Sequence, residues 1–558
     1  MIKEDHNIAR ALPLWANKTP DKIAVCAPIK RGQDQFEYEE LSFSDLNSRS
    51  LFYAHAFRDK GLVPGDKVLM FAKPSVDFSA MTFSLFRLGL VPIFIDPGMG
   101  RKNLLRAVEH IKPDAMVAEP IVHLLAFLFP KAFKTIRVIY TTGRFSPGKL
   151  ESIAALRRQW NNQNKPLLAK IMYPCEKDTM AAILFTSGGT GIPKAVHYNH
   201  GIFNAQVSRL QELFQLSPDD IDLPGFPLFS LFTITMGMKS AIPFMNPSKP
   251  GLANPKHLVQ NIKDNKATFV AGSPAIWQNM VKYCLNEQIT LPSVKYLVMF
   301  GAPVPNNLHR DFKKILTHGD TYTPYGATEC LPVANISGSQ VLALYEGLSP
   351  GLKNKGISTC VGLPVAQTQI KIAPISDGIM TDSAQINWKS TGETGEVCVY
   401  SETVTPEYIG MQEKTEQAKI KDPRGGLWHR MGDLGFLDEE GRLWFSGRLT
   451  HRIELNGKTV PCVPQESIYN ELEAIKRCAF VGPVVNGKPS PTLVVQLKNK
   501  LALKEQQELK AEIFRLDKEG NDLIDNIIFI EKLPVDVRHN IKIDRIKLKK
   551  EIETGALT

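Results

Sequence analysis

The sequence predicts an α/β protein with a large N-terminal domain of mixed α/β sheets, a β-rich subdomain, and a small α+β domain at the C-terminus. Three observations predict this class. Short apolar runs alternate with longer amphipathic segments through most of the chain, the pattern changes to short alternating strands near residue 392, and a third, compact pattern begins after residue 448. Alternation of strands and helices favours parallel sheets with helix crossovers.

The elements of the alternating region follow from run length and spacing. Short apolar runs are expected to be buried strands, and longer segments with apolar residues at helical spacing are expected to be helices. We expect strands at residues 68–71, 92–95, 115–117, 138–140, 268–271 and 294–300, and helices at residues 78–90, 200–214, 274–285 and 306–316.

The end of the chain has the pattern of a separate small domain. A short strand is expected at residues 396–400, before the change of pattern, and strands at 479–485, 493–497 and 527–530 with a helix at 502–514 after it. A unit of this size is compatible with independent folding. We therefore expect two domains, residues 1–448 and residues 449–558.

Composition places the chain among ordinary globular proteins. Its hydrophobic content of 43% and charged content of 22% are typical of that class. The first ten residues are polar, no apolar run reaches the length of a membrane span, and the eight cysteines form no Cys-x-x-Cys pair. We expect no signal peptide, reduced thiols and a cytoplasmic protein.

The formal net charge of +10 is compatible with a nucleic acid, a membrane surface or an anionic small molecule as partner. No interleaved aromatic platform or zinc-finger spacing accompanies the charge, so we expect no nucleic-acid partner. A solvated basic helix face is the preferred interpretation, and a peripheral membrane contact or association with a pathway enzyme is the alternative. Much of the excess lies in Lys542, Arg545, Lys547, Lys549 and Lys550.

A glycine-rich loop follows the apolar run at residues 181–185 and organises the site prediction. Glycines let the backbone approach a ligand, and successive N–H groups in such a loop form a concave donor surface that suits phosphate oxygens. Hydroxyl groups add donors and Lys194 adds a positive charge. The candidate phosphate-binding residues are Thr186, Ser187, Gly188, Gly189, Thr190, Gly191 and Lys194.

This loop is not a Walker A motif. That motif requires a Ser or Thr directly after its lysine, whereas Ala195 follows Lys194. A Gly/Ser surface loop after a strand is the alternative interpretation.

A second group of candidates surrounds residues 301–303 and 322–329. Gly301, Ala302 and Pro303 follow an apolar run, so a strand ends there at a turn that suits a planar base. Further on, the sequence Tyr325-Gly326-Ala327-Thr328-Glu329 combines an aromatic face, a glycine, a hydroxyl and a carboxylate. Magnesium prefers one or two carboxylates together with phosphate oxygens and waters. A β-turn beside a core tyrosine is the alternative.

The third group comes from the last quarter of the chain. Asp433 stands beside Gly432 and Gly435 and can accept hydrogen bonds from both hydroxyls of a ribose, with Arg448 further along. Lys542 lies in Lys542-Ile543-Asp544-Arg545. A surface lysine is the alternative for Lys542.

These motifs, in this order, resemble the signature elements of the acyl-adenylate-forming (AMP-dependent) synthetase superfamily, which includes acyl-CoA ligases, luciferases and the adenylation domains of peptide synthetases. The resemblance runs from residue 41 to residue 548 and implies the adenylate-forming enzyme fold, in which the small C-terminal domain is mobile and rotates between half-reactions. The chain departs from the family pattern at Gly189, Met431, Thr450 and the pair Asn540-Ile541.

The resemblance also implies a role for each motif. The glycine-rich loop binds the phosphates of ATP, Tyr325 stacks on the adenine, and Thr328 meets phosphate. Glu329 binds Mg²⁺. Asp433 holds the ribose hydroxyls beside Arg448, and the residues implied in catalysis are Lys542, Glu329 and Lys194.

Several segments are most similar to the β-lactone synthetases of long-chain olefin biosynthesis, a branch formerly grouped with fatty acyl-CoA ligases. The segments are residues 95–102, 222–229, 323–329, 428–433 and 538–540. The similarity implies ATP-dependent activation of a long-chain 3-hydroxy fatty acid as acyl-AMP, with release of pyrophosphate. The hydroxyl of the substrate then closes a β-lactone, so coenzyme A (CoA) is not required.

Other functions and the remaining site residues stay open. The alternatives are a fatty acyl-CoA ligase, a fatty acyl-AMP ligase or peptide-synthetase-like adenylation enzyme, and a non-catalytic nucleotide-binding homologue. Candidates for an acyl pocket are Phe226, Phe229 and Met236, with ordinary core packing as the preferred interpretation. The sequence does not identify a base for the second step. His429 and His539 are candidates, and we expect both to face solvent.

Overall fold

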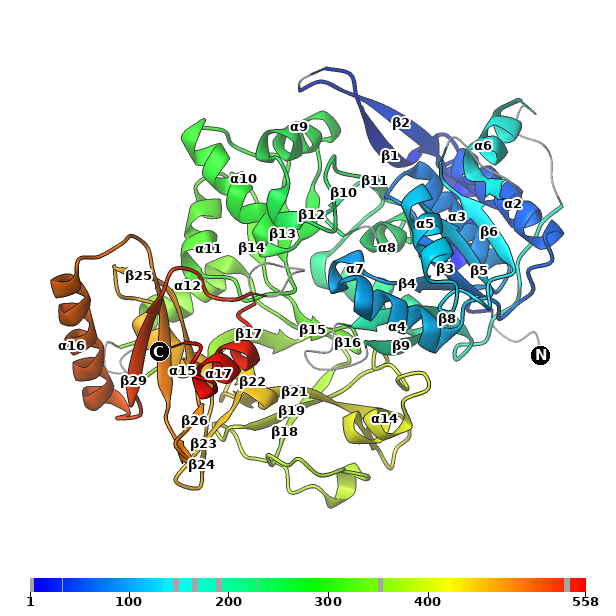
Figure 1. The fold of residues 1–558 in the computed structure, drawn as a ribbon. Coiled ribbons are helices and arrows are strands. Elements are labelled where there is room, and N and C mark those ends of the chain that lie inside the picture. The colour runs from blue at the N-terminus through cyan, green and yellow to red at the C-terminus, as the bar shows by residue number, and fades with distance from the viewer. Residues whose placement is uncertain are drawn as a thin grey trace.

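Two seven-stranded sheets form the larger part of the molecule, and an eight-stranded sheet and a small C-terminal unit complete it (Figure 1). The computed structural model describes residues 5–32, 34–143, 150–162, 169–186, 193–226, 228–349, 355–535 and 542–557.

The first sheet contains the strand that precedes the glycine-rich loop. Its order is β7-β6-β5-β3-β4-β8-β9, parallel except for the β8–β9 pair. The strands are β3 (Lys67–Phe71), β4 (Val91–Phe94), β5 (Ala115–Ala118), β6 (Val138–Thr141), β7 (Glu151–Ser152), β8 (Met180–Thr186) and β9 (Lys194–Asn199). The helices associated with them are α3 (Val76–Arg87), α4 (Arg101–Ile111), α5 (Pro120–Leu128), α6 (Ile153–Asn162) and α7 (His200–Phe214).

The second sheet has the order β14-β13-β12-β10-β11-β1-β2, in which only the β1–β2 pair is antiparallel. The strands are β1 (Ile23–Lys30), β2 (Phe36–Ser42), β10 (Ile221–Pro224), β11 (Lys239–Ala241), β12 (Phe269–Gly272), β13 (Tyr296–Met299) and β14 (Asp320–Tyr322). The helices are α1 (Ala11–Lys18), α2 (Phe43–Asp59), α8 (Phe229–Thr235), α9 (Pro255–Asn265), α10 (Pro274–Asn286), α11 (Asn306–Lys313) and α12 (Gly338–Gly347).

The main core joins these two sheets. Buried side chains of β3 and β8 belong to the same apolar cluster as those of β1 and β12, with α2, α3 and α7 contributing from the helices. Every residue of α3 is buried. Strands buried on both faces are expected to be continuously apolar, as β5 and β8 are. This shared core fixes the carboxyl ends of the parallel strands relative to one another.

The third sheet is the predicted β-rich subdomain. It is antiparallel and has the order β15-β16-β17-β22-β21-β19-β18, with β20 paired to β21. The strands are β15 (Tyr325–Ala327), β16 (Cys330–Asn335), β17 (Thr359–Pro364), β18 (Gln369–Ala373), β19 (Gly395–Tyr400), β20 (Lys419–Lys421), β21 (Leu427–Leu437) and β22 (Leu443–Arg448), and helix α14 is Gln412–Ala418.

The residues after Arg448 form short sheets with their own apolar clusters. The elements are β23 (Ile453–Leu455), β24 (Lys458–Val460), α15 (Cys462–Tyr469), β25 (Ile475–Val481), β26 (Val484–Val485), β27 (Lys488–Pro489), β28 (Thr492–Leu497), α16 (Leu503–Gly520), β29 (Asn526–Ile530) and α17 (Arg545–Glu553). Figure 1 shows α16 and β29 at one end of the molecule and α5 and β5 at the other.

Most predicted elements are present, with shifted ends that have local causes. Helix α7 spans residues 200–214 as expected, and Asn199 caps it by accepting a hydrogen bond from the Ile202 amide at 2.8 Å. Helix α3 ends three residues before the expected position because Gly89 has a left-handed φ of 66°. A Cβ at Gly89 would lie 2.5 Å from the Tyr173 ring, so only glycine fits there.

One expectation for the basic C-terminal segment is wrong. Arg545 does not belong to a solvated helix face, because its guanidinium pairs with the Glu466 carboxylate and its side chain is only 15% exposed. Lys547 and Lys549 are exposed and form ion pairs along α17. Among the described helices, none is both long and apolar enough to cross a bilayer.

Candidate active site

A large cavity opens where the carboxyl ends of β3, β4, β5 and β8 meet the third sheet. Its volume is about 1630 Å³. Ligands of open α/β sheets bind outside the carboxyl ends of the strands. The predicted site residues that line this cavity are Thr186, Lys194, Gly301, Tyr325, Gly326, Thr328, Glu329, Arg448 and Lys542, together with Phe226 and Phe229.

The glycine-rich loop connects two paired strands. Thr186 ends β8 and lies opposite Lys194, which begins β9, so the loop joins an antiparallel pair. A Walker A lysine instead begins a helix, and the position of Lys194 on a strand agrees with the sequence distinction made above. Ser187, Gly188, Gly189, Thr190 and Gly191 lie outside the described residues.

Lys194 is linked to Glu329 through a tyrosine that the sequence analysis did not single out. The Lys194 ammonium donates a hydrogen bond to the Tyr408 hydroxyl at 3.5 Å and lies 4.5 Å from the centre of its ring. The Tyr408 hydroxyl in turn donates to Glu329 Oε1 at 2.8 Å. Burial lowers the pKa of Lys194, and the nearby Glu329 carboxylate partly offsets this effect.

A second lysine is linked to Glu329 through Thr405. Lys419 is buried, and its ammonium donates a hydrogen bond to the Thr405 hydroxyl at 3.3 Å. Burial lowers the pKa of Lys419 to about 8, although the Glu329 carboxylate raises it. Thr405 also donates a hydrogen bond to the Glu329 backbone carbonyl at 3.1 Å. The predicted magnesium ligand is therefore held by groups from the third sheet and its loops.

The expectation that His429 faces solvent is wrong. Its exposed fraction is 2%, and Nδ1 lies 3.2 Å from the Ala418 carbonyl. Burial, with the cations of Lys419 and Lys194, lowers the pKa of His429 well below its ordinary value. The ring is therefore neutral at pH 7, and donation from Nδ1 leaves Nε2 as an acceptor. His429 lines the cavity, whereas His539 lies outside the described residues.

The residues predicted for adenine and ribose form one connected group. The Tyr325 hydroxyl donates a hydrogen bond to Asp433 Oδ2, and Arg448 pairs with Asp433 Oδ1 at 3.0 Å. Burial raises the pKa of Asp433, while the positive charges of Arg448 and Lys542 and the Tyr325 hydrogen bond oppose the rise. Lys542 thus lies near the proposed ribose site in this arrangement of the chain.

One of the three residues of the turn at residues 301–303 lines the cavity. Gly301 lines the cavity and has a φ of 88°, which favours glycine. Ala302 and Pro303 follow it but are not among the lining residues. Gly326 is required for packing, since an added Cβ would lie 2.9 Å from the Cys330 carbonyl oxygen.

The acyl candidates divide between cavity and core. Phe226 and Phe229 line the cavity, and their ring centres lie 6.0 Å apart. Met236 is 3% exposed, packs in the main core and does not line the cavity, so its assignment to an acyl pocket is wrong.

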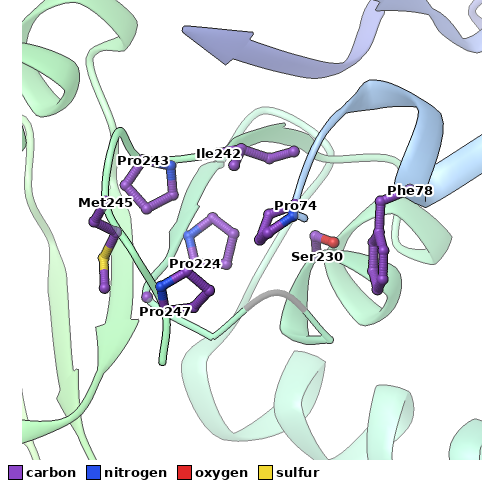
Figure 2. A pocket seen from close by; sticks show the side chains of 9 residues that line it. Pro74, Phe78, Pro224, Ser230, Ile242, Pro243, Met245 and Pro247 are labelled. Carbon is purple, nitrogen blue, oxygen red and sulfur yellow. The ribbon is translucent and has the colours of Figure 1, made fainter. Parts of the chain in front are cut away.

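A small apolar pocket adjoins this part of the cavity. Figure 2 shows the proline rings that surround it, contributed by Pro74, Pro224, Pro243 and Pro247. Pro74, Phe78, Gly225 and Pro247 line both spaces. The pocket is therefore a side extension of the cavity near the acyl candidates.

The donor set suits a magnesium ion bound together with a nucleotide. Within the described part of the chain, no group of three or more His, Cys, Asp or Glu side chains could hold a metal by itself. Glu329 supplies one carboxylate at the cavity wall. Magnesium is commonly held by one or two carboxylates and the phosphates of its substrate, and this donor set fits that mode.

Comparison with known proteins decides the family. The family described as AMP-binding enzyme matches residues 12–409. The chain belongs to the AMP-binding enzyme family. It is therefore an AMP-forming ligase that uses ATP to activate a carboxylic acid, as the sequence motifs predicted.

Two relatives resemble this AMP-binding enzyme over almost its whole length. The olefin beta-lactone synthetase of Xanthomonas campestris pv. campestris is 33% identical over 97% of this chain and 96% of the relative. The protein of the same name from Stenotrophomonas maltophilia is 34% identical over 97% of each chain. The amide bond synthetase McbA from Marinactinospora thermotolerans has the same fold, with a TM-score of 0.78, 19% identity, and coverage of 98% of this chain and 99% of McbA.

Proposed function

We propose that this AMP-binding enzyme converts a long-chain 3-hydroxy fatty acid into a β-lactone, with ATP as the activating substrate. The observation that carries the proposal is the similarity to the two olefin beta-lactone synthetases, which extends through both parts of the chain. The wide cavity that joins the nucleotide candidates to Phe226 and Phe229 supports an acid with a long apolar chain.

The first step forms the acyl-adenylate. A carboxylate oxygen of the acid attacks the α-phosphorus of ATP, and the bond from this phosphorus to the bridging oxygen breaks, so pyrophosphate leaves with the electron pair. Lys194 and Lys542 line the cavity and are suited to stabilise the negative charge that develops on the phosphate oxygens. Glu329 would hold Mg²⁺, which supplies charge neutralisation to the phosphates when it is bound.

The second step closes the ring. The 3-hydroxyl oxygen of the substrate attacks the acyl carbonyl, the bond from this carbon to the AMP oxygen breaks, and the hydroxyl proton passes to a base. Because nucleophile and carbonyl belong to one molecule, the site needs only to hold them in the reacting geometry. The neutral His429 imidazole at the cavity wall is a candidate acceptor for this proton.

The proposed division at residue 448 gives the C-terminal domain a role in the first step. Lys542 and Asp544 line the cavity although they follow the β25-β28-β29 sheet in the chain. We propose that residues 449–558 act as a mobile lid, which brings Lys542 to the nucleotide during adenylation and withdraws it afterwards. Lid movements of this kind exclude water and complete a catalytic site.

The acceptor in the second step is tested by comparing matched acids with and without CoA. A long-chain 3-hydroxy acid and the same acid without its hydroxyl should both support exchange of pyrophosphate into ATP. Net AMP release without CoA should occur only with the hydroxy acid. If net turnover of both acids instead requires CoA, the enzyme is an acyl-CoA ligase and the lactone proposal is wrong.

A further inference from the structure

Helix α5 is apolar on nearly every side, yet none of its residues is buried. Ile121 is 69% exposed, Phe127 80% and Leu128 60%. With Leu124, they are four of the sixteen exposed large apolar side chains among the described residues, although α5 has only nine residues. A helix that is apolar all round normally lies in a protein interior or a membrane, so this exposure calls for a partner.

One face of α5 forms part of the cavity mouth. Ile121, Leu124, Leu125 and Leu128 line the central cavity, and their spacing places them on a single helical stripe. Phe127 is not a lining residue, although it is the most exposed of the apolar side chains in α5. The helix therefore contacts the cavity on one side and is open to the surroundings at its C-terminal end.

Cations surround this C-terminal end. The Arg101 guanidinium lies 5.7 Å from the centre of the Phe129 ring, and the Lys131 side chain is 85% exposed. Lys102 and Lys134 are also exposed. The Glu109 carboxylate pairs with Lys131 itself at 3.4 Å, whereas Glu119, at the N-terminal end of α5, pairs with Lys73 at 3.2 Å. The apolar end of the helix thus carries a net positive rim.

We propose that the cavity mouth docks on an anionic lipid bilayer. The docking face consists of α5, Phe129, Arg101, Lys102, Lys131 and Lys134. Exposed aromatic and aliphatic side chains enter the interfacial region of a bilayer, while basic residues beside them are attracted to anionic headgroups. Entry of an apolar acid along the α5 stripe rests on the proposed function, whereas the docking itself does not.

Vesicle binding by the full-length protein tests the docking face. The protein should sediment with phosphatidylcholine vesicles that contain phosphatidylglycerol, should bind vesicles of phosphatidylcholine alone much more weakly, and should be released by salt. Phe127→Asp should weaken binding at least tenfold, because a large apolar contact is lost. Lys131→Ala and Lys134→Ala should each weaken it roughly fivefold.

A matched control is available on α16, where Leu503 is 79% exposed. Leu503→Asp should bind vesicles like the wild type. Equal binding to neutral and anionic vesicles, or wild-type binding by Phe127→Asp, would overturn the proposal, and so would no binding at all. If Phe127→Asp does not fold, as judged by its thermal melt, the two lysine variants decide the question.

A second readout separates docking from catalysis. Adenylation of a short, water-soluble 3-hydroxy acid should be unchanged by Phe127→Asp, because this acid reaches the cavity from water. Vesicle binding by a protein that fails to exchange pyrophosphate would leave the docking face intact and refute the proposed function instead.

Discussion

At the scale of single residues, the site depends on a small cluster of buried charge. Glu329 accepts a hydrogen bond from Tyr408, which also contacts Lys194. Lys419 donates a hydrogen bond to Thr405, which in turn donates to the Glu329 backbone carbonyl. Removing one member of a buried charged network lowers the free energy of unfolding by more than the intact pair contributes to it, because the remaining buried charge is left without compensation. The orientation of Glu329 should therefore depend on the Tyr408 hydroxyl, which donates a hydrogen bond to its carboxylate.

The variant Tyr408→Phe tests this dependence. It keeps the ring near Lys194 but removes the hydroxyl that donates to Glu329. Hydrogen bonds to charged groups contribute roughly 1.5–3 kcal/mol, so we expect the rate of pyrophosphate exchange to fall about tenfold or more. Tyr322→Phe, in the aromatic cluster with Phe214, is the control and should retain the wild-type rate. Equal rates for both variants would show that the Tyr408 hydroxyl has no role.

Asp222 should make stability depend on pH. It is fully buried on β10, and burial raises its pKa to about 7, although Thr233 and Ser240 donate hydrogen bonds to it. A carboxyl group whose pKa is raised by folding does not lower the free energy of unfolding below its unfolded pKa of about 4, because it is protonated in both states. Above that pH the unfolded state loses its proton first, so the free energy of unfolding falls until the pH passes the folded pKa. We expect Asp222→Asn to melt at a higher temperature than the wild type at about pH 8, with a smaller difference at about pH 5. A difference that does not change with pH would contradict the assignment.

At the scale of elements, short strands of the third sheet carry the candidates Tyr325, Gly326, Asp433 and Arg448. Strand β15 contributes Tyr325 and Gly326, and β21 contributes Asp433. The two strands belong to one sheet but are not neighbours in it, and the hydrogen bond from the Tyr325 hydroxyl to Asp433 connects them across the proposed adenosine site. The close approach of β15 to β16 is possible because Gly326 has no side chain.

A methyl group at Gly326 should therefore disturb this site. The added Cβ of Gly326→Ala would lie 2.9 Å from the Cys330 carbonyl oxygen and 3.0 Å from Leu331, so β15 must move. We expect a higher KM for ATP and a loss of about 1–3 kcal/mol in the free energy of unfolding. Gly347→Ala is the matched control, because nothing lies within 4 Å of its added Cβ. If the two variants behave alike, packing at Gly326 does not position the site.

At the scale of the whole molecule, local pattern predicted much of the fold. The strand before the glycine-rich loop, helix α7 and the two changes of pattern were all visible in the sequence, because the spacing of apolar residues and the capping residues are local signals. Helix ends were less predictable, as at Gly89, where contact with the distant Tyr173 ring excludes a side chain.

The site was predictable only where residues form a motif. Lys194, Glu329 and Asp433 stand in recognisable local patterns, whereas Tyr408 and Lys419 reach the site through pairing between distant segments, such as the bridge between Val196 and Tyr408. The predicted solvent exposure of His429 failed for the same reason. His429 on β21 is paired with Val399 on β19 and with Lys419 on β20, so its burial depends on strands that pair within the third sheet.

The proposed lid makes a prediction for the complete chain. Lys542→Ala should lower acyl-AMP formation by at least a hundredfold, because a positive charge facing the developing phosphate charge is lost. Lys542 is exposed, so we expect only a small change in the melting temperature. Ring closure from synthetic acyl-AMP should continue at the wild-type rate. Lys547→Ala, also exposed and on α17, is the control, and unchanged pyrophosphate release by Lys542→Ala would refute the role of this lysine.

The most direct test of the whole account uses a 3-hydroxy acid with ¹⁸O in both carboxylate oxygens, supplied with ATP and no CoA. If the carboxylate attacks the α-phosphorus and the hydroxyl then closes the ring, mass spectrometry should find one ¹⁸O in AMP and one in the carbonyl of the β-lactone. Unlabelled AMP with both labels in the lactone, or formation of ADP in place of AMP, would contradict acyl-adenylate formation.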